Sequence, residues 1–134
     1  MTAMAKIVDL ERAREHRELC QLVLGILRDW EVRDADQARL LGLEGMTARR
    51  WRRIRSGQEM LPEDEKTLVR IHLILSIYRQ LRLHYPRSQA AADAYATAPL
   101  RSFGGRTPVE VMLEDGEAGM RALLEHLQGS GPWG

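Results

Sequence analysis

The sequence predicts an all-α protein, and three observations support that prediction. Alanine, leucine, arginine and glutamate dominate the 134 residues and favour helix, whereas β-branched residues are few. Apolar residues recur at spacings of three, four and seven, as on one face of a helix. No segment reads convincingly as a strand. Hydrophobic residues make up 44% and charged residues 29%, which is ordinary for one globular domain or two small ones that share a core.

The first predicted helix begins at Ile7, after a frayed terminus at residues 1–6, and ends between Asp29 and Arg33. Its early part, DLERAREHRE, is so polar that we expect it to project into solvent. Trp30 is expected to pack in the core. The apolar positions of this helix are Leu10, Ala13, Leu19, Leu22, Val23, Ile26 and Leu27.

Two short helices joined by a glycine turn are predicted next. The first covers about residues 34–41. The second begins at about residue 44 or 45, with a start after Thr47 as the alternative, and ends at Arg55. A helix-turn-helix needs a small residue where its helices cross, a turn glycine and inward apolar residues. The residues that fit this frame are Ala38, Leu41, Gly42, Leu43, Ala48 and Trp51.

Five arginines lie within seven consecutive residues of the second short helix. With Ala48 and Trp51 facing inward, Arg49, Arg50 and Arg53 should face outward, and Arg52 and Arg55 should flank them. Arginine's fork matches the acceptors of a guanine edge or a phosphate, so this helix is predicted to enter a DNA groove. The net charge of the chain is only +1, so the basic patch is local; a solvated helix face is the alternative. The predicted DNA-contacting residues are Thr47, Arg49, Arg50, Arg52, Arg53 and Arg55.

The most apolar predicted helix runs from Pro62 to about His84. Proline in the first turn, followed by three acidic residues, is typical of a helix start. Because this helix is apolar on nearly every side, it must be covered on several sides. Both a core position and a dimer contact satisfy that requirement, and His72 is expected to be a core residue.

The remaining residues predict short helices around one clear loop. An alanine-rich helix capped by Ser88 is followed by the loop PLRSFGGRTP at residues 99–108. Thr107 and Glu110 form the pattern of a capping box that opens the next helix. That helix should stop at Asp115–Gly116, and a last helix should end at Gly129.

Signals for catalysis, metals and membranes are weak. The histidines (His16, His72, His84 and His126) are not placed by motif beside a nucleophile or a metal ligand. Cys20 is the only cysteine, which excludes an intrachain disulfide and fits a reducing cytoplasm. No apolar run is long enough to span a bilayer, and no signal peptide is evident. We therefore expect a cytoplasmic protein that is not an enzyme and has no cofactor, bound metal or membrane contact.

These motifs resemble those of Xre/MbcA/ParS-type antitoxins, the partners of RES-domain toxins, over roughly residues 27–129. The resemblance rests on LLGLEGMTARRW at residues 40–51, on Arg70 with SIYRQL at residues 76–81, on FGGRTPVEVML at residues 103–113, and on Gly116. The sequence departs from the family at Tyr95, near the place of a frequent tryptophan, and at Leu100, where asparagine often follows the first proline of the loop.

The resemblance implies an antitoxin that neutralises a RES toxin, an enzyme that consumes NAD⁺ or uses it to ADP-ribosylate a target. It also implies that the complex represses its own promoter, and that a C-terminal module docks on the toxin and obstructs its cleft. A NAD⁺ pocket must hold anionic phosphates, so the loop arginines Arg101 and Arg106 suit it, with a solvated loop as the alternative. Trp133 in the tail suits an interface anchor, with a tail folded back on the last helix as the alternative. The predicted toxin-contacting residues are Arg101, Phe103, Gly104, Gly105, Arg106 and Trp133.

The sequence thus predicts two parts. Residues 1–82 form an Xre-like helix-turn-helix domain with the central helix, and residues 83–134 form a small helical toxin-binding and dimerisation module. The predicted function is a type II antitoxin that binds a RES-domain toxin and operator DNA, as a homodimer within a toxin–antitoxin hetero-oligomer. A dimeric helix-turn-helix repressor without a toxin partner is the first alternative. A protein-interaction module whose helix-turn-helix no longer binds DNA is the second.

Overall fold

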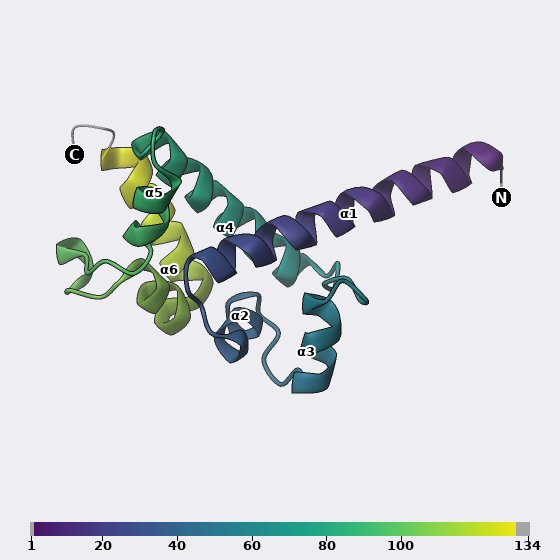
Figure 1. Cartoon of the computed structure of the whole chain (residues 1–134), viewed down its shortest axis with the longest axis horizontal. Coiled ribbons are helices and arrows are strands. Elements are labelled where there is room, and N and C mark those ends of the chain that lie inside the picture. Colours follow the sequence, from purple (N-terminus) through teal and green to yellow (C-terminus); the bar gives the residue numbers. More distant parts are fainter. Residues whose placement is uncertain (1, 131–134) are drawn as a thin grey trace.

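The computed structural model describes residues 2–130, and over that range the chain is helical with no strand (Figure 1). This confirms the all-α prediction. The helices are α1 (Ala3–Asp29), α2 (Asp34–Leu40), α3 (Ala48–Arg55), α4 (Glu65–His84), α5 (Gln89–Tyr95) and α6 (Pro108–Ser130), with a 3-10 turn, η1 (Arg101–Phe103), between the last two. None of the helices in this range is long and apolar enough to cross a membrane.

α1 is a single helix of 27 residues, and its N-terminal end projects beyond the other helices (Figure 1). It begins at Ala3 because the Thr2 hydroxyl accepts a hydrogen bond from the Ala5 N–H, so the expectation of a frayed segment before Ile7 is wrong for the described residues 2–6. Its buried residues start only at His16. Leu10 and Leu22, two of the apolar positions of the predicted helix, are 70% and 52% exposed. The N-terminal half of α1 therefore projects into solvent, as its polarity predicts.

α4 is the central helix of the core. It packs against α1, α5 and most extensively α6, so its apolar faces are largely covered within the chain. The helix starts at Glu65, which places Pro62 before the first turn and not inside it. His72 is exposed and not a core residue, because it lies on the side of α4 opposite Ile74 and Ile77. The dimer contact expected as an alternative role for α4 stays a prediction.

α6 consists of two helical segments joined by a kink. The backbone of Gly116 has φ 64° and ψ −140°, a conformation outside the helical region, so the predicted stop at Asp115–Gly116 is confirmed. The predicted capping box is also present. The Thr107 hydroxyl accepts from the Glu110 N–H at 3.1 Å, and the Glu110 carboxylate accepts from the Thr107 N–H at 3.0 Å. The hydrogen bond from the Thr107 N–H to its carboxylate lowers the pKa of Glu110.

One hydrophobic core runs through the described chain, from Cys20 on α1 to Leu127 on α6. Trp30 is almost fully buried in it, as predicted. The predicted division between residues 82 and 83 falls within the last turn of α4 and stays a prediction. Two arginines tie α2 to the rest of the core. Arg39 donates to the Leu113 carbonyl at 2.9 Å, and Arg70 donates to the Leu40 carbonyl at 3.1 Å.

Candidate functional sites

The helix that carries the arginines begins at its threonine cap. The Thr47 hydroxyl accepts a hydrogen bond from the Arg50 N–H at 3.2 Å, and α3 starts at Ala48. A start at residue 44 or 45 is therefore wrong, and the alternative start after Thr47 is confirmed. The Thr47 hydroxyl therefore caps the first turn of α3.

The inward face of α3 is formed by Trp51 and Ile54, which are 5% and 2% exposed. Ala48, predicted to be the second inward residue, is exposed and borders an open hollow of about 650 Å³ between α2 and α3. The rest of the predicted frame is placed as expected, since Ala38 and Leu41 are buried and Leu43 is half-buried. The register of α3 is thus set by the pair Trp51 and Ile54.

This register changes which arginines face outward. At about 100° per residue, Arg49 lies opposite the midpoint of Trp51 and Ile54, and Arg52 and Arg53 lie on either side of it. Arg50 and Arg55 lie closer to the buried face. The predicted outward set of Arg49, Arg50 and Arg53 is therefore corrected: Arg52 takes the place of Arg50.

Three of the five arginines are already paired with acids. Glu59 accepts from Arg50 Nε at 2.6 Å and from Arg53 Nη2 at 2.7 Å, and Arg55 Nη1 lies 2.6 Å from an Asp34 carboxylate oxygen. The hydrogen bonds from Arg50, and then those from Arg53, lower the pKa of Glu59. Among the described residues, no ion pair or side-chain hydrogen bond engages Arg49 or Arg52. These two guanidinium groups are available to an external anion, whereas Arg50 and Arg53 form a clamp that a carboxylate occupies.

Replacing Glu59 with glutamine is expected to raise the affinity for DNA roughly fivefold at low salt, because the clamp of Arg50 and Arg53 loses its internal anion. The measurement is a titration of labelled DNA by fluorescence anisotropy. Glu125→Gln, an exposed change of the same charge on α6, is the matched control and should raise the affinity for DNA less.

Because the pKa of Glu59 is lowered, its ion pairs with Arg50 and Arg53 persist at neutral pH. Their contribution to stability is lost only in acid, as the pH falls through that lowered pKa. An unchanged affinity in Glu59→Gln would contradict the clamp.

The loop between α5 and α6 closes on itself. The Leu100 N–H donates to the Arg106 carbonyl, and the Gly105 N–H donates to the Leu100 carbonyl, both at 2.9 Å. Phe103 is half-buried and meets the His126 ring edge-on, with the ring centroids 5.5 Å apart. Arg101, Gly104 and Gly105 are exposed. Most of the predicted toxin-contacting residues thus gather in one ordered loop; Trp133 lies outside the described residues.

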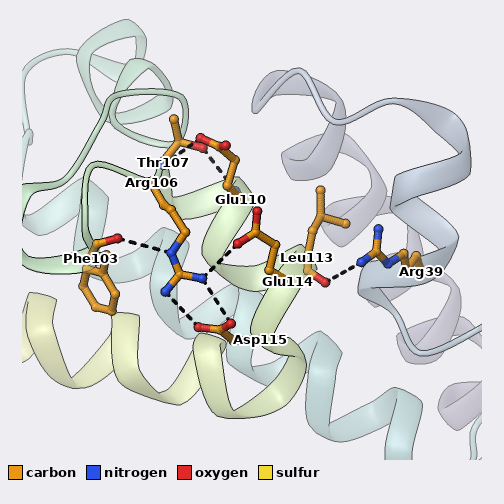
Figure 2. Close-up of polar contacts among 8 residues, drawn as sticks. All are labelled: Arg39, Phe103, Arg106, Thr107, Glu110, Leu113, Glu114 and Asp115. Carbon is orange, nitrogen blue, oxygen red and sulfur yellow. Dashed lines mark hydrogen bonds and ion pairs between the residues drawn. The ribbon is translucent and has the colours of Figure 1, made fainter.

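Arg106 points back onto α6 and not away from the loop (Figure 2). Its guanidinium donates to both carboxylate oxygens of Asp115 at 3.1 Å, to Glu114 at 3.0 Å, and to the Phe103 carbonyl at 3.2 Å. The Asp115 and then the Glu114 hydrogen bonds raise the pKa of Arg106. For this side chain to enter a partner's pocket, all of these contacts would have to break. Arg101 is the loop arginine that stays accessible.

Figure 2 also shows a link that the sequence analysis missed. The C-terminal end of the first segment of α6 holds Arg106 through Asp115 and Glu114, and it holds Arg39 of α2 through the Leu113 carbonyl. Carbonyls at a helix end lack partners within the helix, and arginines satisfy them well. The only sequence signal was the predicted end of this helix at Gly116; nothing in the sequence identified Arg39 as the donor.

The side chains of His16 and His84 contact backbone carbonyls. His16 lies 2.7 Å from the Leu61 carbonyl and 3.5 Å from Cys20 Sγ, and His84 lies 3.0 Å from the Leu127 carbonyl. Over residues 2–130, no group of three or more histidine, cysteine or acidic side chains is placed to hold a metal ion. The expectation that the chain is not an enzyme stays an expectation.

Comparisons with protein-family models, with curated proteins and with solved structures returned no match for this chain. The resemblance to Xre/MbcA/ParS-type antitoxins therefore rests on the motifs that carry it.

Proposed function

We propose that this chain is an antitoxin that binds operator DNA through α3 and a RES-domain toxin through the loop between α5 and α6. The observation that carries the DNA-binding part is that Arg49 and Arg52 lie outward on α3 without acidic partners. The toxin-binding part rests on the sequence resemblance and on the accessible, ordered loop. The complex represses its own promoter, and the antitoxin blocks a toxin that consumes NAD⁺ or transfers ADP-ribose from it.

The geometry of α3 suits insertion into a groove of DNA. The helix has eight residues and stands on an inward face of Trp51 and Ile54, so its opposite face is basic over its whole length. A major groove admits a helix of this kind. Arg49 and Arg52 lie three residues apart and therefore on one face, where both can reach base edges or phosphates together. Arg50 and Arg53 can join them when a DNA phosphate displaces Glu59.

The loop offers a partner a surface of defined shape. Main-chain hydrogen bonds within the loop, the Phe103 ring packed on His126 and the Arg106 contacts to α6 hold it in place. A preformed loop loses little conformational entropy on binding. Arg101, exposed beside the two glycines, supplies the positive charge for an acidic or phosphate-binding cleft.

Arg101→Ala is expected to weaken binding to a RES-domain toxin about 10-fold or more, because an accessible arginine at an interface centre contributes on the order of 1–2 kcal/mol. The measurement is isothermal titration with the purified toxin, followed by the toxin's NAD⁺ consumption in the presence of the antitoxin. Arg87→Ala, an exposed arginine in the connection before α5, is the matched control. Full neutralisation by Arg101→Ala would remove this residue from the interface.

Two alternatives each have one observation in their favour. The inward orientation of Arg106 favours a repressor whose loop is purely structural and meets no toxin. The occupation of the Arg50 and Arg53 clamp by Glu59 favours an interaction module that no longer binds DNA. The three candidate functions are distinguished by measuring whether the chain binds the DNA upstream of its own gene. The measurement is made with and without the toxin encoded beside that gene. DNA binding without a neighbouring RES toxin supports the repressor, and toxin binding without DNA binding supports the interaction module.

A further inference from the structure

The projecting half of α1 exposes large apolar side chains that no other part of residues 2–130 covers. Met4 and Leu10 are 69% and 70% exposed, and Ile7 is 50% exposed. Leu22, further along the helix, is also exposed. Most of the large exposed apolar residues of the described chain lie on this one helix (Figure 1). Single exposed residues are ordinary, but a cluster on one projecting element marks an interaction surface.

The helical state of this segment also calls for a partner. Residues 3–15 make about four turns without tertiary packing, and an isolated helix of that length is marginal in water. One hydrogen bond, which the Thr2 hydroxyl accepts from the Ala5 N–H, caps the start, and one exposed ion pair, between Arg14 and Glu18 at 3.4 Å, supports the turns that follow. Neither contact is strong enough to hold the segment helical alone. Packing of an apolar face against a second helix supplies the stabilisation that the isolated segment lacks.

The charges on this segment are balanced, and their order fits a second copy of the same helix. Four basic residues (Lys6, Arg12, Arg14, Arg17) and four acidic ones (Asp9, Glu11, Glu15, Glu18) lie between residues 3 and 19. At about 100° per residue, the face directed away from the core carries Met4, Ile7, Glu11, Arg14, Glu18 and Leu22. Apolar residues lie at both ends of this face, and two acids and a base (Glu11, Arg14 and Glu18) lie between them.

We infer that the N-terminal halves of two α1 helices pair antiparallel, on a two-fold axis that passes between residues 12 and 13. In that arrangement, Glu11 of each copy lies opposite Arg14 of the other, which gives two reciprocal ion pairs. The overlap of residues 3–22 is about 30 Å long at 1.5 Å per residue. This inference deepens the homodimer in the proposed function by naming its interface, but it needs neither DNA nor toxin to be true.

The body of the protein has a receiving surface where the partner helix would end. Opposite Leu22 in this register lies Ala3 of the second copy, and Met4 lies one residue further along. Leu22 borders a hollow of about 290 Å³ between α1 and α4, lined by Leu75 and Tyr78 and by two arginines, Arg79 and Arg82. A methionine side chain is flexible enough to fill an irregular apolar hollow of this kind. Met4 of each copy thus lies beside Leu22 of the other, Ile7 lies opposite Glu18, and the charged centre sets the register.

Charge reversal on the full-length protein tests the pairing, with the association state measured by sedimentation velocity without DNA. The wild type is expected to sediment as a dimer. Glu11→Arg places two arginines opposite each other, and Arg14→Glu places two glutamates opposite each other, so each variant should weaken the dimer at least 10-fold. The double variant Glu11→Arg/Arg14→Glu should restore it. An equimolar mixture of the two single variants should form a heterodimer, because the basic centre of one then meets the acidic centre of the other.

The mixture separates pairing from damage to the helix, since a merely unfolded α1 would not recover on mixing. A monomeric wild type at tens of micromolar overturns the inference, and so does a dimer that none of the charge reversals weakens. DNA binding is measured separately on the same variants, whose α3 arginines are unchanged. Loss of dimerisation with intact DNA binding to a half-site is the expected pattern. A dimer that fails to bind any DNA counts against the proposed function and not against the pairing.

Discussion

The double variant Arg49→Ala/Arg52→Ala is expected to lose operator binding, with an affinity at least about 30-fold below that of the wild type. Each arginine that makes a bidentate base contact contributes about 1–3 kcal/mol of discrimination, and these are the two on α3 that no acid engages. If they contact phosphates instead, the loss is similar for every sequence, and the salt dependence of log K becomes shallower by about 0.9 per lost contact. Titrations of operator and unrelated DNA at several salt concentrations distinguish the two roles.

Two matched variants make this result specific. Arg87→Ala/Arg121→Ala removes the same charge from positions away from α3 and should leave affinity within about twofold, because exposed charges more than a Debye length away are screened. Arg50→Ala/Arg53→Ala should cost less than Arg49→Ala/Arg52→Ala, since those arginines must first leave Glu59. A larger loss in Arg50→Ala/Arg53→Ala would show that the clamp, and not the outward pair, makes the main DNA contact.

The helices themselves were largely predictable from the sequence, because each is marked by local chemistry. The capping box of Thr107 and Glu110, the Ser88 cap of α5 and the stop at Gly116 are all present. These signals act over three or four residues, so no knowledge of the rest of the fold is needed to identify them. The start of α1 was missed because Thr2 caps a segment in which none of the described residues before His16 is buried, and amphipathic periodicity cannot reveal such a segment.

The register of α3 was not predictable from residue size alone. Ala48 fits a helix crossing by its small size, but the hollow between α2 and α3 stays open beside it, and Ile54 fills the inward position instead. An alanine and an isoleucine six residues apart lie on different sides of a helix, so this choice moves the outward arginines. The burial of Ile54 depends on residues brought together by the fold, which the local sequence does not specify.

The acidic partners of the arginines were also not predictable from the sequence. Glu59 lies six residues beyond Arg53 and outside α3, and Asp115 lies nine beyond Arg106, so neither pair follows from helical spacing. The sequence therefore indicated the charges that could bind an anion but not which of them already have one. The fold reduces the candidates on α3 to Arg49 and Arg52, and in the loop to Arg101.

We expect the largest loss of folding stability where a single methyl group is added close to the kink of α6, at Gly119. A Cβ added at Gly119 would lie 2.6 Å from the Val111 carbonyl oxygen and 2.8 Å from Asp115 Cβ, closer than such atoms can approach. The backbone oxygen cannot move without shifting the first segment of α6. Gly119→Ala should therefore cost about 1–3 kcal/mol or more, as overpacking of a buried site does. For a chain of this length, that is a fall in Tm of about 3–5 °C per kcal/mol.

Thermal unfolding by circular dichroism checks this, with two variants for comparison. Gly129→Ala has no atom within 4 Å of the added methyl and should be neutral or slightly stabilising, because alanine favours helix. Gly116→Ala places an L-residue at φ 64° and ψ −140° and should cost about 1–3 kcal/mol through backbone strain. Because the kink also positions Asp115 for Arg106 and the Leu113 carbonyl for Arg39, the loss at Gly119 should be accompanied by weaker toxin binding. If Gly119→Ala unfolds at the wild-type temperature, the two segments of α6 do not approach each other so closely, and the loop is held by other contacts.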